Sequence, residues 1–299
     1  MRKTLIIGAN GFLGCICLQF FNKNYEVVAA DIENTCLPLN TKFVHFDLTK
    51  LTNIREVLNR ETPELVVLLA AMTDVDKCEL YPKMAFAVNR DGPQIVAQVC
   101  HAIGARLIFI STDFVFDGQK RGKYLESDAP NPISIYGRSK LEAEQAILQA
   151  GCDVLICRTA VLYGWPLPAQ RDNFASWLVK SLSAGQRVRI VSSQYNTPTF
   201  ADNLAECLSK MTRFSGSQIY HTVGSTGLSR YTFAMKLTGI FDFPPDLVES
   251  IETFPQKAQR PPYACLSNEK AAQDFSIHFA TVEEGLMAMK KTRKIDRTK

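Results

Sequence analysis

The sequence KTLIIGANGFLG, residues 3–14, predicts a buried β-strand, a glycine-rich turn and the start of a helix. Residues 3–7 form a short apolar and β-branched run that ends at Gly8, as a buried strand does. An apolar-periodic helix and a second strand follow, and the second strand ends in Asp31. Strand, glycine turn, helix and strand within about 30 residues make a βαβ unit.

The three glycines of this turn have separate roles. Gly8 permits a tight turn, Gly11 lets a pyrophosphate approach the backbone, and Gly14 lets the helix pack closely on the strand. The helix N-terminus then presents free N–H groups and a positive dipole to the phosphates. Asp31 follows the last glycine by 17 residues, where a carboxylate can accept from both ribose hydroxyls. The segment therefore predicts a dinucleotide site.

The alternation of strands and helices continues along the chain. Further strands are expected over 42–46, 65–69, 106–110 and 153–157, and further helices over 52–59, 82–103 and 137–149. Pro93 is expected to kink the long helix. Such alternation predicts an α/β protein with a doubly wound parallel sheet, whose ligands bind at the carboxyl ends of the strands. Four predicted strand ends should therefore meet in one crevice: Asp31, Asp47, Ala70-Ala71 and Ser111-Thr112.

The chain changes character after Gly164, where prolines cluster. Helices near 173–184, over 200–211 and over 230–237, with a strand over 188–191, indicate a smaller, interleaved C-terminal substrate lobe. We expect a dinucleotide-binding domain over 1–160, to which residues 190–222 and the C-terminal helix return. The substrate-binding lobe is expected over 161–189 and 223–280.

Composition excludes several classes of function. A net charge of +4 is too small to indicate a nucleic-acid partner, and no signal peptide or membrane span is visible in the sequence. The nine cysteines are scattered without a C-x-x-C motif, which favours a reducing compartment, and we expect a cytoplasmic protein. The four histidines lack ligand spacing, so no metal is expected. A homodimer is the default expectation for a soluble enzyme of this size.

Tyr136 and Lys140 lie at the start of the helix predicted over 137–149, one turn apart on one face. A lysine ammonium beside a phenol is expected to lower the pKa of the tyrosine and make the pair a proton donor. Chance alone gives about 0.5 such pairs in a chain of this composition. The pair alone therefore does not indicate a function, and its interpretation depends on the segments that precede it.

Taken together, these segments resemble an extended short-chain dehydrogenase/reductase, and within that superfamily the dTDP-4-dehydrorhamnose reductases, from about residue 3 to 290. The resemblance implies a Rossmann fold and the NAD(P)H-dependent reduction of the 4-keto group of a nucleotide-activated deoxysugar. The segments that carry it are 8–14, 70–79, 111–118, 124–130, 136–140, 158–159, 197–199 and 260–261.

The resemblance also implies roles for three catalytic residues. The nicotinamide would deliver hydride to the carbonyl carbon while Tyr136 gives a proton to the oxygen. Lys140 would hold the nicotinamide ribose and keep Tyr136 reactive. Thr112 would hydrogen-bond the carbonyl oxygen, although a hydroxyl that satisfies a strand-end amide is the alternative interpretation.

The resemblance further implies which residues bind ligands. Asn89 is expected to brace the site, with a solvent-facing helix position as the alternative, and Arg260 is expected to bind a diphosphate, with a surface ion pair as the alternative. The expected cofactor-binding residues are Gly8, Asn10, Gly11, Phe12, Leu13, Gly14, Asp31, Ile32, Asp47, Leu48, Ala70, Ala71, Met72, Asn89, Tyr136 and Lys140. The expected substrate-binding residues are Thr73, Asp113, Phe114, Val161, Asn173, Gln194 and Arg260.

Departures from the family pattern bear on the reaction and the substrate. Phe114 stands where the dehydratases of the superfamily carry a second carboxylate, which argues against dehydration. Val161 replaces a tryptophan and Ala264 a serine of the rhamnose enzymes, so the sugar can differ. Asp31 would repel a 2′-phosphate, and we expect NADH to be accepted at least as well as NADPH.

Two other functions remain open from the sequence. A nucleotide-sugar 4-epimerase needs only the same threonine, tyrosine and lysine. The regulatory β subunit of methionine adenosyltransferase, which binds NADP and acts mainly through a partner protein, belongs to the same subfamily. An intact catalytic set favours a working reductase but is also compatible with a regulatory subunit in which the set is unused.

Overall fold

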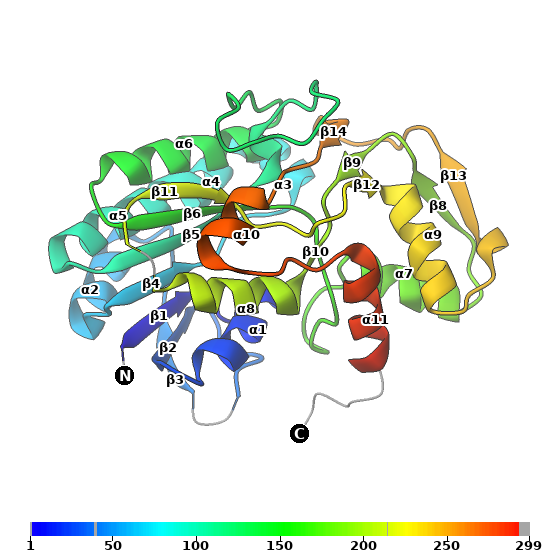
Figure 1. Ribbon diagram of the computed structural model, residues 1–299. Helices are drawn as coiled ribbons and strands as arrows, with labels where there is room; N and C mark the ends of the chain where they lie inside the picture. Colours follow the sequence, from blue (N-terminus) through cyan, green and yellow to red (C-terminus); the bar gives the residue numbers. More distant parts are fainter. Residues whose placement is uncertain (1, 39–40, 214, 293–299) are drawn as a thin grey trace.

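A computed structural model describes residues 2–38, 41–213 and 215–292. Its centre is a seven-stranded parallel sheet of order β11-β6-β5-β4-β1-β2-β3 (Figure 1). The chain runs outward from β1 in one direction through β2 and β3, and in the other through β4, β5 and β6, so the switch point lies between β1 and β4. This confirms the predicted doubly wound sheet. The strands are β1 (Lys3–Ile7), β2 (Glu26–Asp31), β3 (Lys42–His45), β4 (Leu65–Leu68), β5 (Arg106–Thr112), β6 (Val154–Thr159) and β11 (Gln218–His221).

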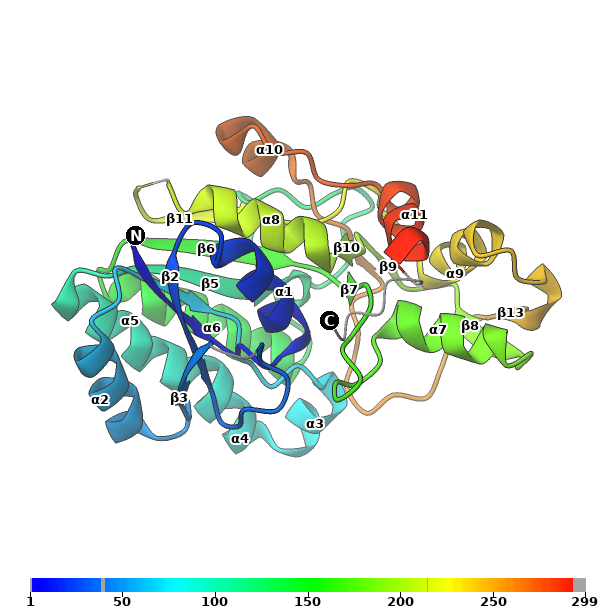
Figure 2. The same ribbon diagram turned by 90° about the horizontal axis from the view of Figure 1, so that it is seen from below.

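Helices cover both faces of the sheet, as Figure 2 shows. Successive strand residues point to opposite faces, so Leu5 and Ile7 enter one apolar core and Ile6 the other. Burial on both faces explains why β1, β4 and β5 are almost continuously apolar. The helices of one face are α2 (Leu51–Glu61), α5 (Gly92–Ile103) and α6 (Ile135–Gln149), and those of the other are α1 (Phe12–Phe21), α8 (Ala201–Met211) and α10 (Glu269–Phe275).

The long helix predicted over 82–103 contains one wide turn. It consists of α4 (Pro82–Phe86), a π-helical turn at Ala87–Asp91 and α5. Pro93 has no N–H to give to the carbonyl of Asn89, and the amide of Gly92 reaches back five residues to Ala87. The irregularity predicted at Pro93 therefore takes the form of a π turn just before it.

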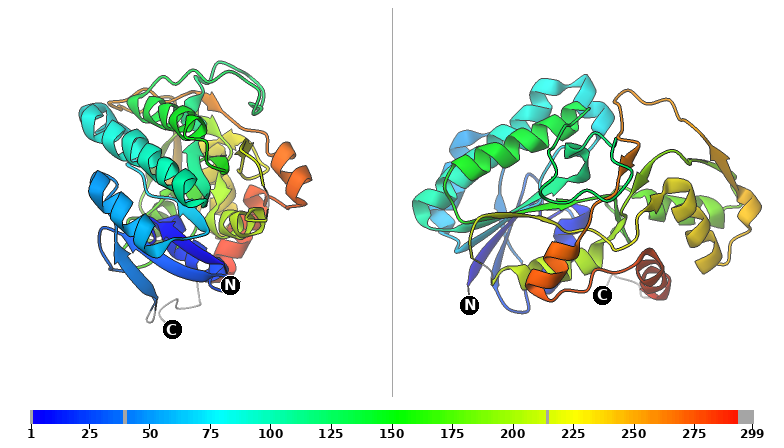
Figure 3. Two further views of the ribbon diagram at one scale, coloured as in Figure 1. Left: turned by 90° about the vertical axis from the view of Figure 1, so that its left-hand side faces the viewer. Right: turned by 45° about the horizontal axis from the view of Figure 1, so that its top comes forward.

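A smaller lobe lies beyond the carboxyl ends of the sheet strands (Figures 1 and 3) and has an apolar core of its own. Its strands β8 and β13 pair in parallel. The C-terminal helix α11 packs in this core against α9, not against the sheet as expected, because Val282, Leu286 and Met289 are buried there. The elements are α7 (Phe174–Ser183), β8 (Val188–Val191), α9 (Arg230–Ile240), β13 (Val248–Ile251) and α11 (Val282–Thr292).

The segment that does return to the sheet after the lobe is α10, which contacts β11. Of the residues 190–222 that were expected to return, 201–221 do so, since α8 packs on α1 and β11 pairs with β6, whereas Ile190 of β8 is buried in the core of the smaller lobe. We propose to divide the chain into two units by these cores: the two cores on the faces of the sheet define one unit, and the core of the smaller lobe defines the other. The described helices include none long and apolar enough to cross a membrane.

Short elements connect the sheet to the lobe. β7 pairs with β10, and β9 pairs with both β12 and β14. Two 3₁₀ turns, η2 (Asp113–Val115) and η3 (Pro245–Leu247), and helix α3 (Val75–Leu80) complete the fold. The short strands are β7 (Leu162–Tyr163), β9 (Tyr195–Asn196), β10 (Thr199–Phe200), β12 (Leu228–Ser229) and β14 (Tyr263–Ala264).

Candidate active site

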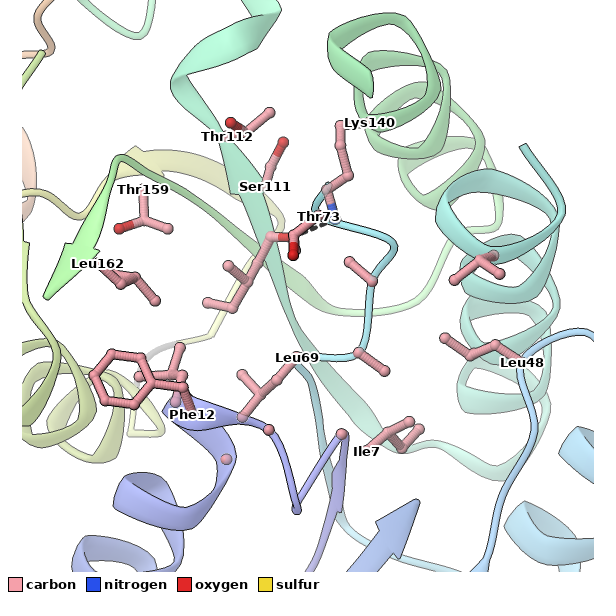
Figure 4. A pocket seen from close by; sticks show the side chains of 18 of the residues that line it. Ile7, Phe12, Leu48, Leu69, Thr73, Ser111, Thr112, Lys140, Thr159 and Leu162 are labelled. Atoms are coloured by element: carbon pink, nitrogen blue, oxygen red, sulfur yellow. Dashed lines mark hydrogen bonds between the residues drawn. The ribbon is translucent and has the colours of Figure 1, made fainter. Parts of the chain in front are cut away.

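A cavity of about 990 Å³ lies at the carboxyl ends of β1, β2, β4 and β5. Figure 4 shows Ser111, Thr112 and Lys140 at one side of it and Ile7 and Leu48 at the opposite side. The convergence of strand ends predicted from the sequence is therefore present. The expected site residues in its lining are Gly8, Asn10, Gly11, Phe12, Leu13, Gly14, Asp31, Ile32, Asp47, Leu48, Ala70, Ala71, Thr73, Thr112, Asp113, Phe114, Tyr136, Lys140 and Val161.

The glycine turn has the geometry that a diphosphate requires. Gly8 has φ +89°, and a Cβ on Gly14 would lie 2.1 Å from the Gly8 carbonyl oxygen, so neither position accepts a side chain without rearrangement. Helix α1 begins after Gly11, and no side chain caps it. The N–H groups of its first turn thus remain for a ligand, and these residues fit the phosphates of a dinucleotide.

Asp31 closes the same end of the cavity. One carboxylate oxygen accepts from the Asn10 N–H at 2.9 Å and the other from the Ile32 N–H at 2.8 Å. Both oxygens keep lone pairs for ribose hydroxyls, because a carboxylate accepts up to about four hydrogen bonds. The cations among the described lining residues are Lys140 and Arg230, which come from α6 and α9. The end of β2 and the loop that follows it therefore add the carboxylates of Asp31 and Glu33 to the lining, but no cation.

The catalytic residues stand where β5 meets the start of α6. The Ser134 hydroxyl caps α6 by accepting from the Gly137 N–H at 3.2 Å. A Cβ on Gly137 would lie 2.1 Å from the Phe114 carbonyl oxygen, so only glycine lets this helix come so close to the turn after Thr112. The Tyr136 ring consequently packs edge-on against Phe114, with 5.8 Å between the ring centroids.

The electrostatics of Tyr136 and Lys140 differ from the sequence prediction. Burial raises the pKa of Tyr136 above its ordinary value, although a hydrogen bond with the Thr112 hydroxyl acts in the opposite direction. The Lys140 ammonium donates to the Ile110 carbonyl oxygen at 2.6 Å, and burial lowers its pKa to about 7. The prediction that Lys140 lowers the pKa of Tyr136 is therefore wrong for this structure. The phenol keeps its proton at neutral pH, as a proton donor must.

Sequence reasoning missed Arg230, which enters the lining from the first turn of α9. It interacts with Asp113, which is 3% exposed and accepts from the Thr112 hydroxyl at 3.0 Å. Burial raises the pKa of Asp113 to about 7, while Thr112 and Arg230 work against this rise. No motif marks Arg230 in the sequence, because only the tertiary fold brings α9 to the end of β5.

Asn89 and Met72 lie outside the lining and hold it in place. The Asn89 side chain is fully buried, so the solvent-facing interpretation is wrong. Its oxygen accepts from the Met72 N–H at 2.8 Å, and its nitrogen donates to the Met72 carbonyl and the Ser139 hydroxyl, each at 3.1 Å. The π turn thus ties the loop after β4 to the helix that carries Tyr136.

Three expected substrate residues are engaged elsewhere in the structure. Asn173 caps α7, Gln194 donates to the Gln256 side chain at 3.1 Å, and Arg260 pairs with Asp76 at 2.8 Å. These residues are absent from the described lining, and for Arg260 the alternative of an ion pair is what the structure contains. A helix cap, a side-chain hydrogen bond and an ion pair with α3 therefore occupy these three polar side chains. Of the two family departures, Val161 lines the cavity, whereas Ala264 is buried in β14 and does not.

Comparison with known proteins decides the family. The model of the RmlD substrate binding domain matches residues 1–294. The chain belongs to this family. The resemblance found in the sequence motifs is thereby confirmed.

Proteins that carry reductase names match over nearly the whole of this chain. A dTDP-4-dehydrorhamnose reductase of Mycobacterium tuberculosis is 35% identical, with 91% of this chain and 86% of the relative covered. A probable low-salt glycan biosynthesis reductase of Haloferax volcanii is 30% identical, with 96% of each chain covered. The crystal structure of the Bacillus anthracis dTDP-4-dehydrorhamnose reductase in complex with NADP superposes with a TM-score of 0.88 at 27% identity, covering 97% of this chain and 99% of that one.

Proposed function

We propose that this chain reduces the 4-keto group of a nucleotide-activated deoxysugar with NAD(P)H, as a dTDP-4-dehydrorhamnose reductase does. The observation that carries the proposal is the placement of Thr112, Tyr136 and Lys140 in a cavity that also contains the glycine turn and Asp31. A dinucleotide bound to that turn brings a redox group and a carbonyl substrate into one cavity. The names of the RmlD-type relatives support this reaction.

Each catalytic residue then has a distinct role in the reduction of the carbonyl group. A bound reduced nicotinamide supplies the hydride for the carbonyl carbon. Tyr136 holds its proton until the carbonyl oxygen gains charge, and then donates it. Thr112 directs a hydroxyl at the same oxygen and stabilises the developing charge. Lys140, when protonated, hydrogen-bonds the ribose hydroxyls and supplies positive charge beside Tyr136.

We propose that NADH is accepted at least as well as NADPH. The support is the acidic end of β2, where Asp31 and Glu33 line the cavity and the only cations in the described lining come from other elements. A 2′-phosphate would meet a carboxylate there instead of a guanidinium or an ammonium. We also propose a cytoplasmic protein, in keeping with nine free thiols that a reducing compartment preserves, and a homodimer, which is the default for a soluble enzyme of this size.

The deciding experiment measures oxidation of NADH and NADPH with dTDP-4-dehydro-6-deoxy-L-mannose by wild type and by Tyr136→Phe. We expect turnover in wild type and a loss of about 10²- to 10⁴-fold in the variant, with unchanged cofactor affinity. Tyr81→Phe, a change at a 61% exposed ring, is the matched control and should leave turnover unchanged. Tight cofactor binding without turnover on any 4-keto sugar would instead favour the regulatory subunit.

A further inference from the structure

Three buried polar side-chain atoms of the described cavity lining lack a hydrogen-bond partner, namely Asp113 Oδ2, Arg230 Nε and Thr159 Oγ1, and the first two belong to charged groups. In the part of the chain that the structure describes, the second carboxylate oxygen of Asp113 and the Nε of Arg230 accept or donate no hydrogen bond. Both residues line the cavity, one from the end of β5 and one from α9 of the smaller lobe. A buried polar group without a partner costs free energy, so such a pair in a cavity indicates a ligand that satisfies both.

The two charges influence each other without touching. Arg230 lowers the pKa of Asp113, and Asp113 raises that of Arg230. Yet no ion pair within 4.0 Å joins them among the described residues. The backbone N–H of Arg230 donates to the Gln194 carbonyl at 3.0 Å, and its guanidinium lies 5.4 Å from the centre of the Phe174 ring. These contacts position the Arg230 side chain, and its Nε–H group is left to donate a hydrogen bond to a ligand.

The guanidinium of Arg260, which lies near Arg230, already has hydrogen-bond partners of its own. Arg260 is paired with Asp76 and also donates to the Ala258 carbonyl at 2.7 Å. Its charge lowers the pKa of Arg230 in addition to the effect of burial. Arg230 is therefore the arginine of the cavity lining that retains an unsatisfied donor, and Arg260 is not in that lining.

A neutral diol fits this arrangement better than an anion. A sugar hydroxyl can donate to the free Asp113 oxygen while a second hydroxyl oxygen accepts from Arg230. A carboxylate substituent would gain from the guanidinium but would be repelled by the carboxylate opposite. The first oxygen of Asp113 accepts from the Thr112 hydroxyl, whose proton must turn to the carbonyl oxygen when the substrate binds, so Asp113 lies beside the carbonyl group. We therefore expect Asp113 to hydrogen-bond the hydroxyl on the carbon next to the carbonyl carbon.

We propose that Asp113 and Arg230 recognise two adjacent hydroxyls of the keto sugar, with Asp113 on the C3 hydroxyl and Arg230 on the C2 hydroxyl. This inference rests on the proposed function and names its substrate class: a 4-keto sugar that bears both hydroxyls. Arg230 is then a specificity-determining residue, contributed by the smaller lobe.

The test compares kcat/KM for the parent 4-keto sugar with that for its 2-deoxy analogue. Wild type should prefer the parent by about 10- to 150-fold, the factor that a hydrogen bond to a charged group contributes. In Arg230→Leu this preference should fall below about threefold. Arg230→Lys keeps the charge and an alkyl chain over Phe174, and it replaces the leucine variant in the test if that variant does not fold. We expect Arg230→Lys to lose most of the preference for the parent sugar as well. Arg55→Leu, at an exposed position on α2, is the matched control and should keep the wild-type ratio.

A second readout separates sugar recognition from phosphate recognition. The Kd for dTDP alone should change less than about twofold in Arg230→Leu, because dTDP has no pyranose. A loss above about tenfold would assign Arg230 to the diphosphate and overturn the inference. An unchanged preference for the parent sugar in Arg230→Leu would overturn it as well, while leaving the reductase proposal intact. Absence of turnover by wild type on every 4-keto sugar would overturn the proposed function and this inference with it.

Discussion

The Glu144 carboxylate accepts from the Arg158 guanidinium at 2.6 Å, and each side chain is only 2% exposed. The same carboxylate accepts from the Ser111 hydroxyl, which directly precedes Thr112 on β5. Glu144 lies one helical turn beyond Lys140 on α6. This ion pair therefore fixes the helix that carries the catalytic tyrosine and lysine to strands β5 and β6.

Removing one partner of this ion pair should lower the free energy of unfolding substantially. Glu144→Ala leaves the Arg158 charge buried and unpaired, so we expect a loss of about 3–5 kcal/mol in the free energy of unfolding, measured by urea denaturation. The double variant Glu144→Leu with Arg158→Met should recover part of the loss, because it removes both charges. Glu206→Gln, in an exposed pair with Lys210, is the control and should cost less than about 1 kcal/mol. A Glu144→Ala loss as small as that of the control would contradict the prediction.

The glycine turn gives a second prediction. In Gly14→Ala the new Cβ would lie 2.1 Å from the Gly8 carbonyl oxygen and 2.7 Å from that of Ala9, so the turn must shift. We expect NADH and NADPH affinity to fall by more than about tenfold, measured by fluorescence titration, because the turn no longer fits the diphosphate. Gly239→Ala, with open space around its Cβ in α9, is the matched change and should stabilise the protein by up to about 1 kcal/mol. Undiminished affinity in Gly14→Ala would refute this role of the turn.

Local patterns predicted most of the sheet and the cofactor end of the cavity. The segment from β1 through the glycine turn to Asp31 is contiguous, and its glycines act on backbone conformation, which the sequence reveals directly. Tyr136 and Lys140 were found because helical spacing puts them on one face. Thr112 was found because it falls at the end of a parallel strand, where ligands bind.

The remaining parts of the site depend on contacts between distant segments. Arg230 reaches the cavity only because α9 of the smaller lobe lies beside the end of β5. Conversely, Arg260 is engaged by Asp76, a partner 184 residues away that no local pattern reveals. The pKa of Tyr136 was predicted with the wrong sign, since helical spacing gives the distance to Lys140 but not the burial of both groups.

The choice of cofactor should change with Asp31. Asp31→Asn removes the negative charge and keeps an oxygen that can accept one of the two N–H groups now bound. We expect the ratio of kcat/KM for NADPH to that for NADH to rise by more than about tenfold, or 1.4 kcal/mol. Asp246→Asn removes a carboxylate from an exposed turn of the smaller lobe and should leave the ratio unchanged. A wild-type enzyme that already prefers NADPH more than tenfold would show that Asp31 does not set the preference.

Lys140 should make the stability of the cofactor-free protein depend on pH. Burial lowers the pKa of Lys140 from 10.5 to about 7 in the folded protein, so between these values the unfolded chain binds one proton more. The free energy of unfolding should therefore rise with pH across this window, by up to about 1.4 kcal/mol per unit, and this contribution should be flat below pH 7.

Lys140→Met lacks this titration and keeps a similar volume. The difference in unfolding free energy, wild type minus Lys140→Met, should therefore increase from pH 7 to about pH 10 in urea denaturation series. Lys83→Met, at an exposed position on α4, is the control, and its difference from wild type should stay constant. Parallel pH curves for wild type and Lys140→Met would mean that the ammonium stays protonated throughout, held by its bond to the Ile110 carbonyl. In that case Lys140 could supply positive charge to the reaction over the whole working range of pH.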